Sequence, residues 1–109
     1  MNIQHQELAS GRWNQLSLME QLDNIGSEVE RTINWRNKNN INYSQLAFIR
    51  ALELTDLTIA DPKNIGRLKE ILRMREALAD YFAFDNIYGS TDQSWKKYFL
   101  AFNYAARAI

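Results

Sequence analysis

Residues that break helices are scarce in this chain, which has one proline and four glycines among 109 residues. Along the segments between them, apolar residues recur every three or four positions, which is the spacing of an amphipathic helix. The alternation of apolar and polar residues that marks a β-strand is not sustained in any segment. The sequence therefore predicts an all-α fold.

Polar residues with capping ability predict where four helices begin. Ser17 is followed three residues later by Glu20, which is the pattern of a capping box. Pro62 follows Asp61 at the first position of the third helix, where the backbone N–H has no partner within the helix and its absence costs nothing. The predicted caps are Ser17, Asn42, Asp61 and Ser90, and the helices span about 17–36, 42–60, 61–82 and 90–109. Short connections favour antiparallel neighbours, so we expect an up-down-up-down four-helix bundle over residues 13–109, preceded by a loose arm at residues 1–12.

Composition narrows the classes of function. Thirteen basic and thirteen acidic residues give a formal net charge of zero, so no overall field attracts nucleic acid or an anionic membrane. No segment reaches the roughly 18 apolar residues of a membrane span, and the N-terminus lacks the pattern of a signal peptide. The chain has no cysteine, which removes thiolate metal sites. We expect a cytoplasmic protein without a cofactor and without a membrane partner, and nucleic acid is a disfavoured partner.

Three arginines fall on or in line with the apolar stripes of the predicted helices. Arg50 lies at the centre of the second stripe, Arg75 in the middle of the third, and Arg36 one turn past the end of the first. Burying an unpaired guanidinium is costly, so each arginine needs a carboxylate, a carbonyl or a ligand anion within reach. The carboxylates that flank these stripes are Glu28, Glu53, Asp56 and Glu76. Either these groups form structural ion pairs, or the arginines bind an anion such as a phosphate.

Catalytic and nucleic-acid interpretations rest on fewer residues. Glu53 and Asp56 have the spacing with which helical nucleotide pyrophosphatases hold magnesium, so a magnesium-dependent nucleotide hydrolase is an alternative. A ferritin-like di-iron site needs Glu-x-x-His pairs, and the single histidine, His5, belongs to the arm. Basic residues of the third helix interleave with acidic ones, which makes nucleic-acid binding a weak alternative.

The second predicted helix is apolar on two sides. Opposite the Arg50 stripe, Phe48, Leu52 and Ile59 recur at helical spacing. A helix that is apolar nearly all round needs to be covered on both faces. Either the N-terminal arm or the long aromatic loop before the last helix covers this second face, or a second subunit does. Two-fold homodimers are the commonest soluble assembly, so we expect these three residues to form an oligomer interface.

Most of the chain after Trp13 resembles a widespread set of short, all-helical bacterial and archaeal proteins without an assigned activity. The stretches that carry the resemblance are "NIGSEVERTINW", "RALELTDLTIADPKN", "RLKEILRMREALADYF" and "YGSTDQSWKKYFLAFNYAARA". The resemblance implies a free-standing single domain and no particular chemistry. The leading prediction is a non-catalytic homodimeric interaction module with an unidentified protein partner, and the alternatives are an anion or nucleotide binder and a weak nucleic-acid binder.

Overall fold

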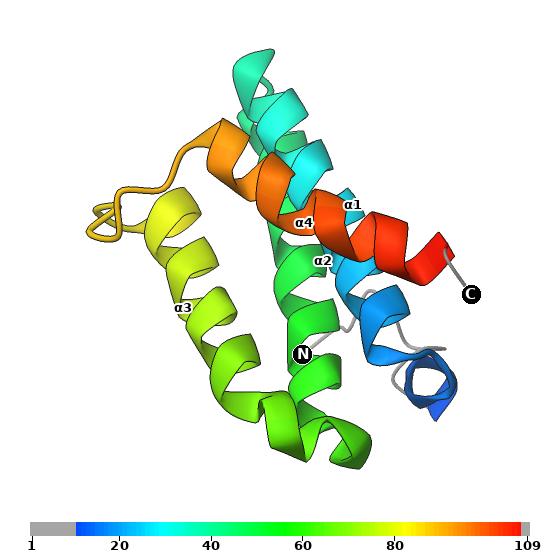
Figure 1. The fold of residues 1–109 in the computed structure, drawn as a ribbon. Helices are drawn as coiled ribbons and strands as arrows, with labels where there is room; N and C mark the ends of the chain where they lie inside the picture. Colours follow the sequence, from blue (N-terminus) through cyan, green and yellow to red (C-terminus); the bar gives the residue numbers. More distant parts are fainter. Residues whose placement is uncertain (1–10, 108–109) are drawn as a thin grey trace.

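The computed structural model of the chain describes residues 11–107. Its four α-helices are α1 (Leu18–Asn37), α2 (Ile41–Ala60), α3 (Leu68–Ala83) and α4 (Asp92–Arg107), and two short 3₁₀ helices are η2 (Trp13–Gln15) and η3 (Pro62–Arg67). Successive helices alternate in direction, and α4 crosses α1 obliquely (Figure 1). No strand occurs within the described range, so the predicted all-α four-helix fold is confirmed. Most of the predicted arm, residues 1–10, and the predicted end of the last helix at 108–109 lie outside the described residues.

The caps follow the predicted chemistry, with two shifts in position. Ser17 and Glu20 form the expected capping box at the start of α1. The cap of α2 is Asn40 rather than Asn42, because Asn39 turns the chain in the left-handed region (φ 63°) and places the Asn40 side chain to accept from the N–H of Tyr43. This exchange starts α2 earlier than predicted.

The cap of α4 is also displaced. The hydroxyl of Thr91 accepts from the backbone N–H of Ser94 at 3.0 Å, and the hydroxyl of Ser94 accepts from the N–H of Thr91 at 2.9 Å. These reciprocal bonds replace the predicted cap at Ser90.

The third predicted helix is divided in two. Asp61 and Pro62 start η3 as expected, but the regular helix α3 begins only at Leu68. The side-chain amide of Asn64 is buried and donates to Gln21 Oε1 at 2.9 Å and to the Thr58 carbonyl at 3.0 Å. These bonds tie the turn to α1 and α2.

The core lies between α1 and its two neighbours, α2 and α4, with α3 packed on α2. At Gly26 of α1, a Cβ atom would lie 2.7 Å from the Cβ of Phe99 of α4, so glycine permits the close crossing of the two helices. Around this crossing, α1 contributes most of the fully buried aliphatic side chains. The buried apolar cluster consists of Trp13, Leu22, Ile25, Val29, Ile33, Ala51, Leu54, Ile71, Met74, Leu78, Trp95 and Phe99.

A buried polar network closes the end of the bundle where α1 starts and α2 ends. The indole N–H of Trp13 donates to Thr58 Oγ1 at 3.0 Å, and the amide of Gln21 donates to Asp61 Oδ2 at 2.9 Å. Asp61 also forms an ion pair with Lys63. Burial alone would raise the pKa of Asp61, but the bonds from Lys63 and Gln21 outweigh it and hold this pKa below its usual value. The network was not predicted from the sequence.

Candidate functional site

The side chain of Arg50 lies at the edge of the contact between α1 and α2. It is 34% exposed, and its Nη1 is 3.8 Å from Oε2 of the buried Glu28, whose Oε1 accepts from Arg31 at 2.6 Å. The predicted pairing of Arg50 with Glu28 is therefore present, but Arg50 is not buried in the core. Glu53 is half-buried on the same helix.

The rotation of α2 explains this difference. The face of α2 that packs on α1 contains mainly small and hydroxyl-bearing residues. A pattern of large apolar side chains therefore does not reveal this face. Thr55 donates to the carbonyl of Ala51 at 2.7 Å and Thr58 to that of Leu54 at 2.8 Å, so both hydroxyls are satisfied within the helix. The packed face consists of Ser44, Ala47, Ala51, Leu54, Thr55 and Thr58.

Arg36 lies at the other end of the bundle, as predicted, where it joins three helices. Its guanidinium carbon is 4.8 Å from the ring centroid of Tyr81 and 4.9 Å from that of Phe82. Its Nη2 donates to the Tyr81 hydroxyl at 2.9 Å and to Asp92 Oδ1 at 2.8 Å. The carboxylate of Asp92 was not among the predicted partners.

The same contacts shift the pKa of Asp92. Burial alone would raise the pKa of Asp92, but hydrogen bonds from Tyr81 and Asn37, together with Arg36, lower it below its usual value. Burial and the bond to Asp92 raise the pKa of Tyr81. The carboxylate is thus held ionised at neutral pH.

Arg75 lies on the surface, so the prediction that it points into the core is wrong. Its Nε donates to Oδ1 of Asp56 at 2.7 Å, and both side chains are partly exposed. The core of α3 is formed by Ile71, Met74 and Leu78, and Arg75 reaches sideways from this stripe to α2. Asp56, which was predicted to bind magnesium with Glu53, is therefore paired with Arg75. Within residues 11–107, no group of three or more His, Cys, Asp or Glu side chains is placed to hold a metal ion. The three arginines form separate pairs and do not converge on one site.

Of the residues predicted to form an oligomer interface on α2, Phe48 contacts α3. The ring of Phe48 packs against that of Phe82 with centroids 5.4 Å apart, and Ile59 packs on the core. Phe48, Leu52 and Ile59 are each half-buried. Among the described residues, the element that covers Phe48 is thus α3, whereas the prediction named the arm, the loop or a second subunit.

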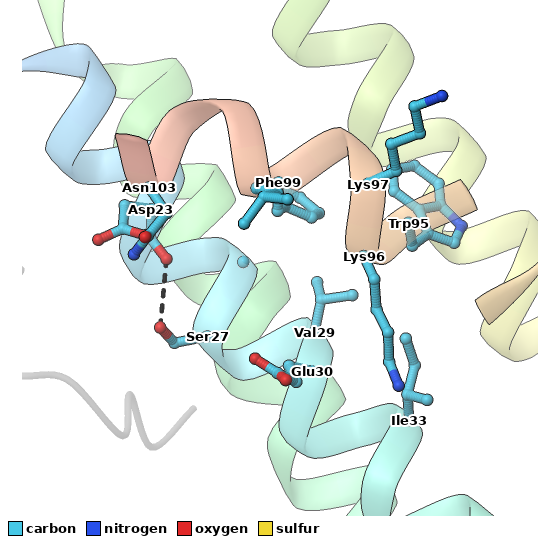
Figure 2. Close-up of a pocket in the computed structure, with 12 residues that line it drawn as sticks. Asp23, Ser27, Val29, Glu30, Ile33, Trp95, Lys96, Lys97, Phe99 and Asn103 are labelled. Atoms are coloured by element: carbon cyan, nitrogen blue, oxygen red, sulfur yellow. Dashed lines mark hydrogen bonds between the residues drawn. The ribbon is translucent and has the colours of Figure 1, made fainter. Parts of the chain in front are cut away.

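A groove of about 400 Å³ runs between α1 and α4 (Figure 2). Gly26, Val29 and Phe99 are among its apolar lining residues, and Asn103 donates to Asp23 Oδ1 at 2.9 Å across the two helices. Figure 2 shows the side chain of Lys96 extending from α4 toward Glu30 and Ile33 of α1, whereas Lys97 points away. The hydroxyl of Ser27 donates to the Asp23 carbonyl at 3.3 Å. The groove combines an apolar floor with polar side chains, a combination suited to binding.

A second groove, of about 500 Å³, lies between α3 and α4. The two helices approach each other at the loop that joins them and diverge from there (Figure 1). Met74 and Ala77 line one wall, and Trp95, Tyr98 and Phe102 line the other. The Tyr98 ring packs edge-on against both Trp95 and Phe102, with centroids 5.5 and 5.3 Å away. This groove is the more apolar of the two, and Glu70, Arg73 and Ser94 complete its lining.

Trp95 connects the two grooves, because its ring contributes to both linings. The ring stacks on Phe99, and its nitrogen lies on the side away from Phe99 in Figure 2. Within residues 11–107, this Nε1 is one of two buried side-chain polar atoms without a hydrogen-bond partner, the other being Oε2 of Glu28.

No family model, no curated protein and no solved structure matches the chain. The resemblance to short helical proteins of bacteria and archaea therefore stays a prediction. Within the described part of the chain, no helix combines the length and the apolar character needed to cross a bilayer.

Proposed function

We propose that the protein is a non-catalytic interaction module that acts as a homodimer in the cytoplasm and uses the groove between α3 and α4 as its contact surface. The observation that carries the proposal is the open edge of the bundle. A closed four-helix bundle buries apolar side chains along all four of its edges. Here the edge between α3 and α4 is a groove. Met74 and Trp95 in its lining are buried, whereas the ring of Tyr98 stays 40% exposed.

We favour a second copy of the chain as the occupant of the groove, because the same molecule exposes apolar side chains such as Phe84 and Ile87. When a groove and exposed apolar side chains lie on one surface, each can contact the other across a two-fold axis. The contact then forms twice and gives a closed dimer. Tyr98 lines the groove and is 40% exposed, so its ring offers apolar surface that a second copy would cover.

Anion binding is less well supported. Arg36 and Arg75 each donate a hydrogen bond to a carboxylate within 2.8 Å, so a ligand anion would have to displace Asp92 or Asp56. Arg50 is the remaining candidate, and it lies beside the buried carboxylate of Glu28.

Sedimentation equilibrium tests the proposal with a matched pair of variants on one helix. We expect the wild-type protein to be dimeric at tens of micromolar and Tyr98→Lys to be monomeric, because a lysine in the groove places a charge in an apolar contact. Tyr104→Lys is the control: Tyr104 is 68% exposed and is not among the residues that line either groove. A wild-type monomer, or equal effects of the two substitutions, would contradict the proposal.

A further inference from the structure

The loop between α3 and α4 presents large apolar side chains to solvent. Phe84 is 75% exposed and Ile87 is 81% exposed. Tyr88, beside them, is also exposed. Isolated exposed apolar residues are ordinary on protein surfaces, but a cluster on one short loop is typical of a binding surface.

The backbone of this loop is held in one conformation. The buried carboxylate of Asp80 accepts from the N–H groups of Ile87 and Tyr88 at 2.9 and 3.1 Å. The side chain of Asn86 accepts from the N–H of Ser90 at 2.8 Å and donates to its carbonyl at 3.0 Å. Because the loop is already ordered, little conformational entropy is lost when it binds.

Two left-handed residues complete the turn. Asn86 has a φ of 53° and Gly89 a φ of 67°, a region that asparagine and glycine tolerate. The N–H of Gly89 donates to the Asn86 carbonyl at 3.1 Å. The apolar side chains therefore project from a rigid turn.

The loop joins the two helices that form the walls of the α3–α4 groove, so the loop and the groove adjoin on one surface. Arg73 lines the groove. The N–H groups of Ile87 and Tyr88 donate to the carboxylate of Asp80 on α3, so the loop is fixed to the helix that carries Arg73. The projection and the hollow are thus adjacent on the same molecule.

The charges of this surface are complementary, and they are not paired with each other or with other charges among residues 11–107. Among the described residues, neither Arg73 nor Asp85 has an ion-pair partner within 4.0 Å. Asp85 is exposed on the loop directly after Phe84, and Arg73 is exposed at the rim of the groove. Each charge offers the other a partner in a second copy.

We propose that in the homodimer each loop enters the α3–α4 groove of the other copy. Phe84 and Ile87 pack on the apolar lining of that groove, and Asp85 pairs with Arg73 of the second copy. The contact forms twice by symmetry. This inference rests on the proposed function and deepens it, since it names the segment that fills the groove.

A charge exchange tests the pairing by sedimentation equilibrium. We expect Arg73→Asp and Asp85→Arg each to raise the dimer dissociation constant at least tenfold. The double variant should return it to within about threefold of the wild-type value, because the exchanged charges attract again. Glu30→Arg and Lys97→Asp reverse exposed charges outside this surface and should leave the constant unchanged.

Crosslinking tests the same contact without relying on affinity. The chain has no cysteine, so Asp85→Cys and Arg73→Cys each introduce a single thiol. A mixture of the two variants, one of them carrying a mass tag, should give a mixed disulfide dimer under mild oxidation. A mixture of Asp85→Cys and Lys97→Cys should not.

The outcomes separate this inference from the proposed function. A wild-type dimer that is unaffected by the single charge reversals and gives no mixed disulfide dimer would overturn the loop-in-groove contact and leave dimerisation standing. A wild-type monomer would overturn both. Phe84→Ser, which changes an exposed side chain and leaves the Asp80 bonds intact, should also dissociate the dimer, and a dimer of wild-type strength for this variant would overturn the contact.

Discussion

Replacing Gly26 by alanine tests the crossing of α1 and α4 directly. The added methyl group would lie 2.7, 2.8 and 2.9 Å from the Cβ, Cγ and Cδ1 atoms of Phe99. Ordinary carbon contacts lie at about 3.5–4.0 Å, so the helices must separate by on the order of 1 Å. A different rotamer of Phe99 cannot relieve the clash, because its Cβ is fixed to the backbone of α4.

Two opposing effects set the magnitude. Alanine is favoured over glycine inside a helix by up to about 1 kcal/mol. Overpacking of a well-packed contact costs about 1–3 kcal/mol. Because the clash involves the Cβ atom of a buried residue, we expect the packing cost to prevail and Gly26→Ala to lower the free energy of unfolding by about 1–2 kcal/mol. In a domain of about this size, each kcal/mol corresponds to roughly 4–8 °C in Tm.

Urea unfolding followed by far-ultraviolet circular dichroism measures this loss. The matched control is Gly66→Ala, since a Cβ atom at Gly66 would meet no atom within 4 Å beyond its own turn of the chain. This control should be neutral or stabilising by up to about 1 kcal/mol, because alanine reduces the freedom of the unfolded chain. If Gly26→Ala proves as stable as the wild type or more stable, α4 does not cross α1 at this residue.

Three further predictions concern the charged groups. Arg50→Met should lower the free energy of unfolding in urea by less than about 1 kcal/mol, because Arg50 is one-third exposed and its Nη1 lies 3.8 Å from Glu28. Arg36→Met should lower it by about 2 kcal/mol, because the substitution removes two hydrogen bonds and two ring contacts. Equal losses for the two variants would contradict these positions. Asp92→Asn should destabilise the protein at pH 7 by about 1–2 kcal/mol and much less near pH 3. The pKa of Asp92 is lowered in the folded protein, so the stability that its carboxylate contributes is present above the unfolded pKa of about 3.9 and is lost as pH falls through the folded pKa. A stability difference between Asp92→Asn and the wild type that does not depend on pH would refute this. Phosphate and nucleotides, with or without Mg²⁺, should leave Tm unchanged, whereas a ligand at 100 times its Kd would add about 2.7 kcal/mol, so a clear shift would revive the anion-binding alternative.

Helix content and most helix ends could be predicted from the sequence, because caps and apolar periodicity are local properties. Ser17 and Asp61 act as caps where their sequence context predicted. The shift from Asn42 to Asn40 arose because several asparagines follow one another, and only the left-handed turn at Asn39 selects between them. Local sequence does not specify which of several equivalent caps the chain geometry uses.

The candidate site was less predictable, since it depends on how helices cross. Arg50 and Arg75 were placed in the core because the apolar stripes were centred on large side chains, whereas α2 packs through alanine, serine and threonine. The grooves beside α4 follow from its oblique course over α1, which helical periodicity does not determine. Gly26, a glycine in the middle of an apolar stripe, was the one local signal of a close crossing.

The attachment of α4 also determines how the molecule opens. Its docking contacts are made mainly with α1, through Phe99 at Gly26, Asn103 at Asp23 and Asp92 at Arg36, while the edge toward α3 is a groove. We therefore expect α4 to separate while α1, α2 and α3 stay packed, at a lower free energy than that of global unfolding. In native-state hydrogen exchange, amides of α4 should exchange through this low-energy opening, and the buried amides of α1 and α2 only through complete unfolding.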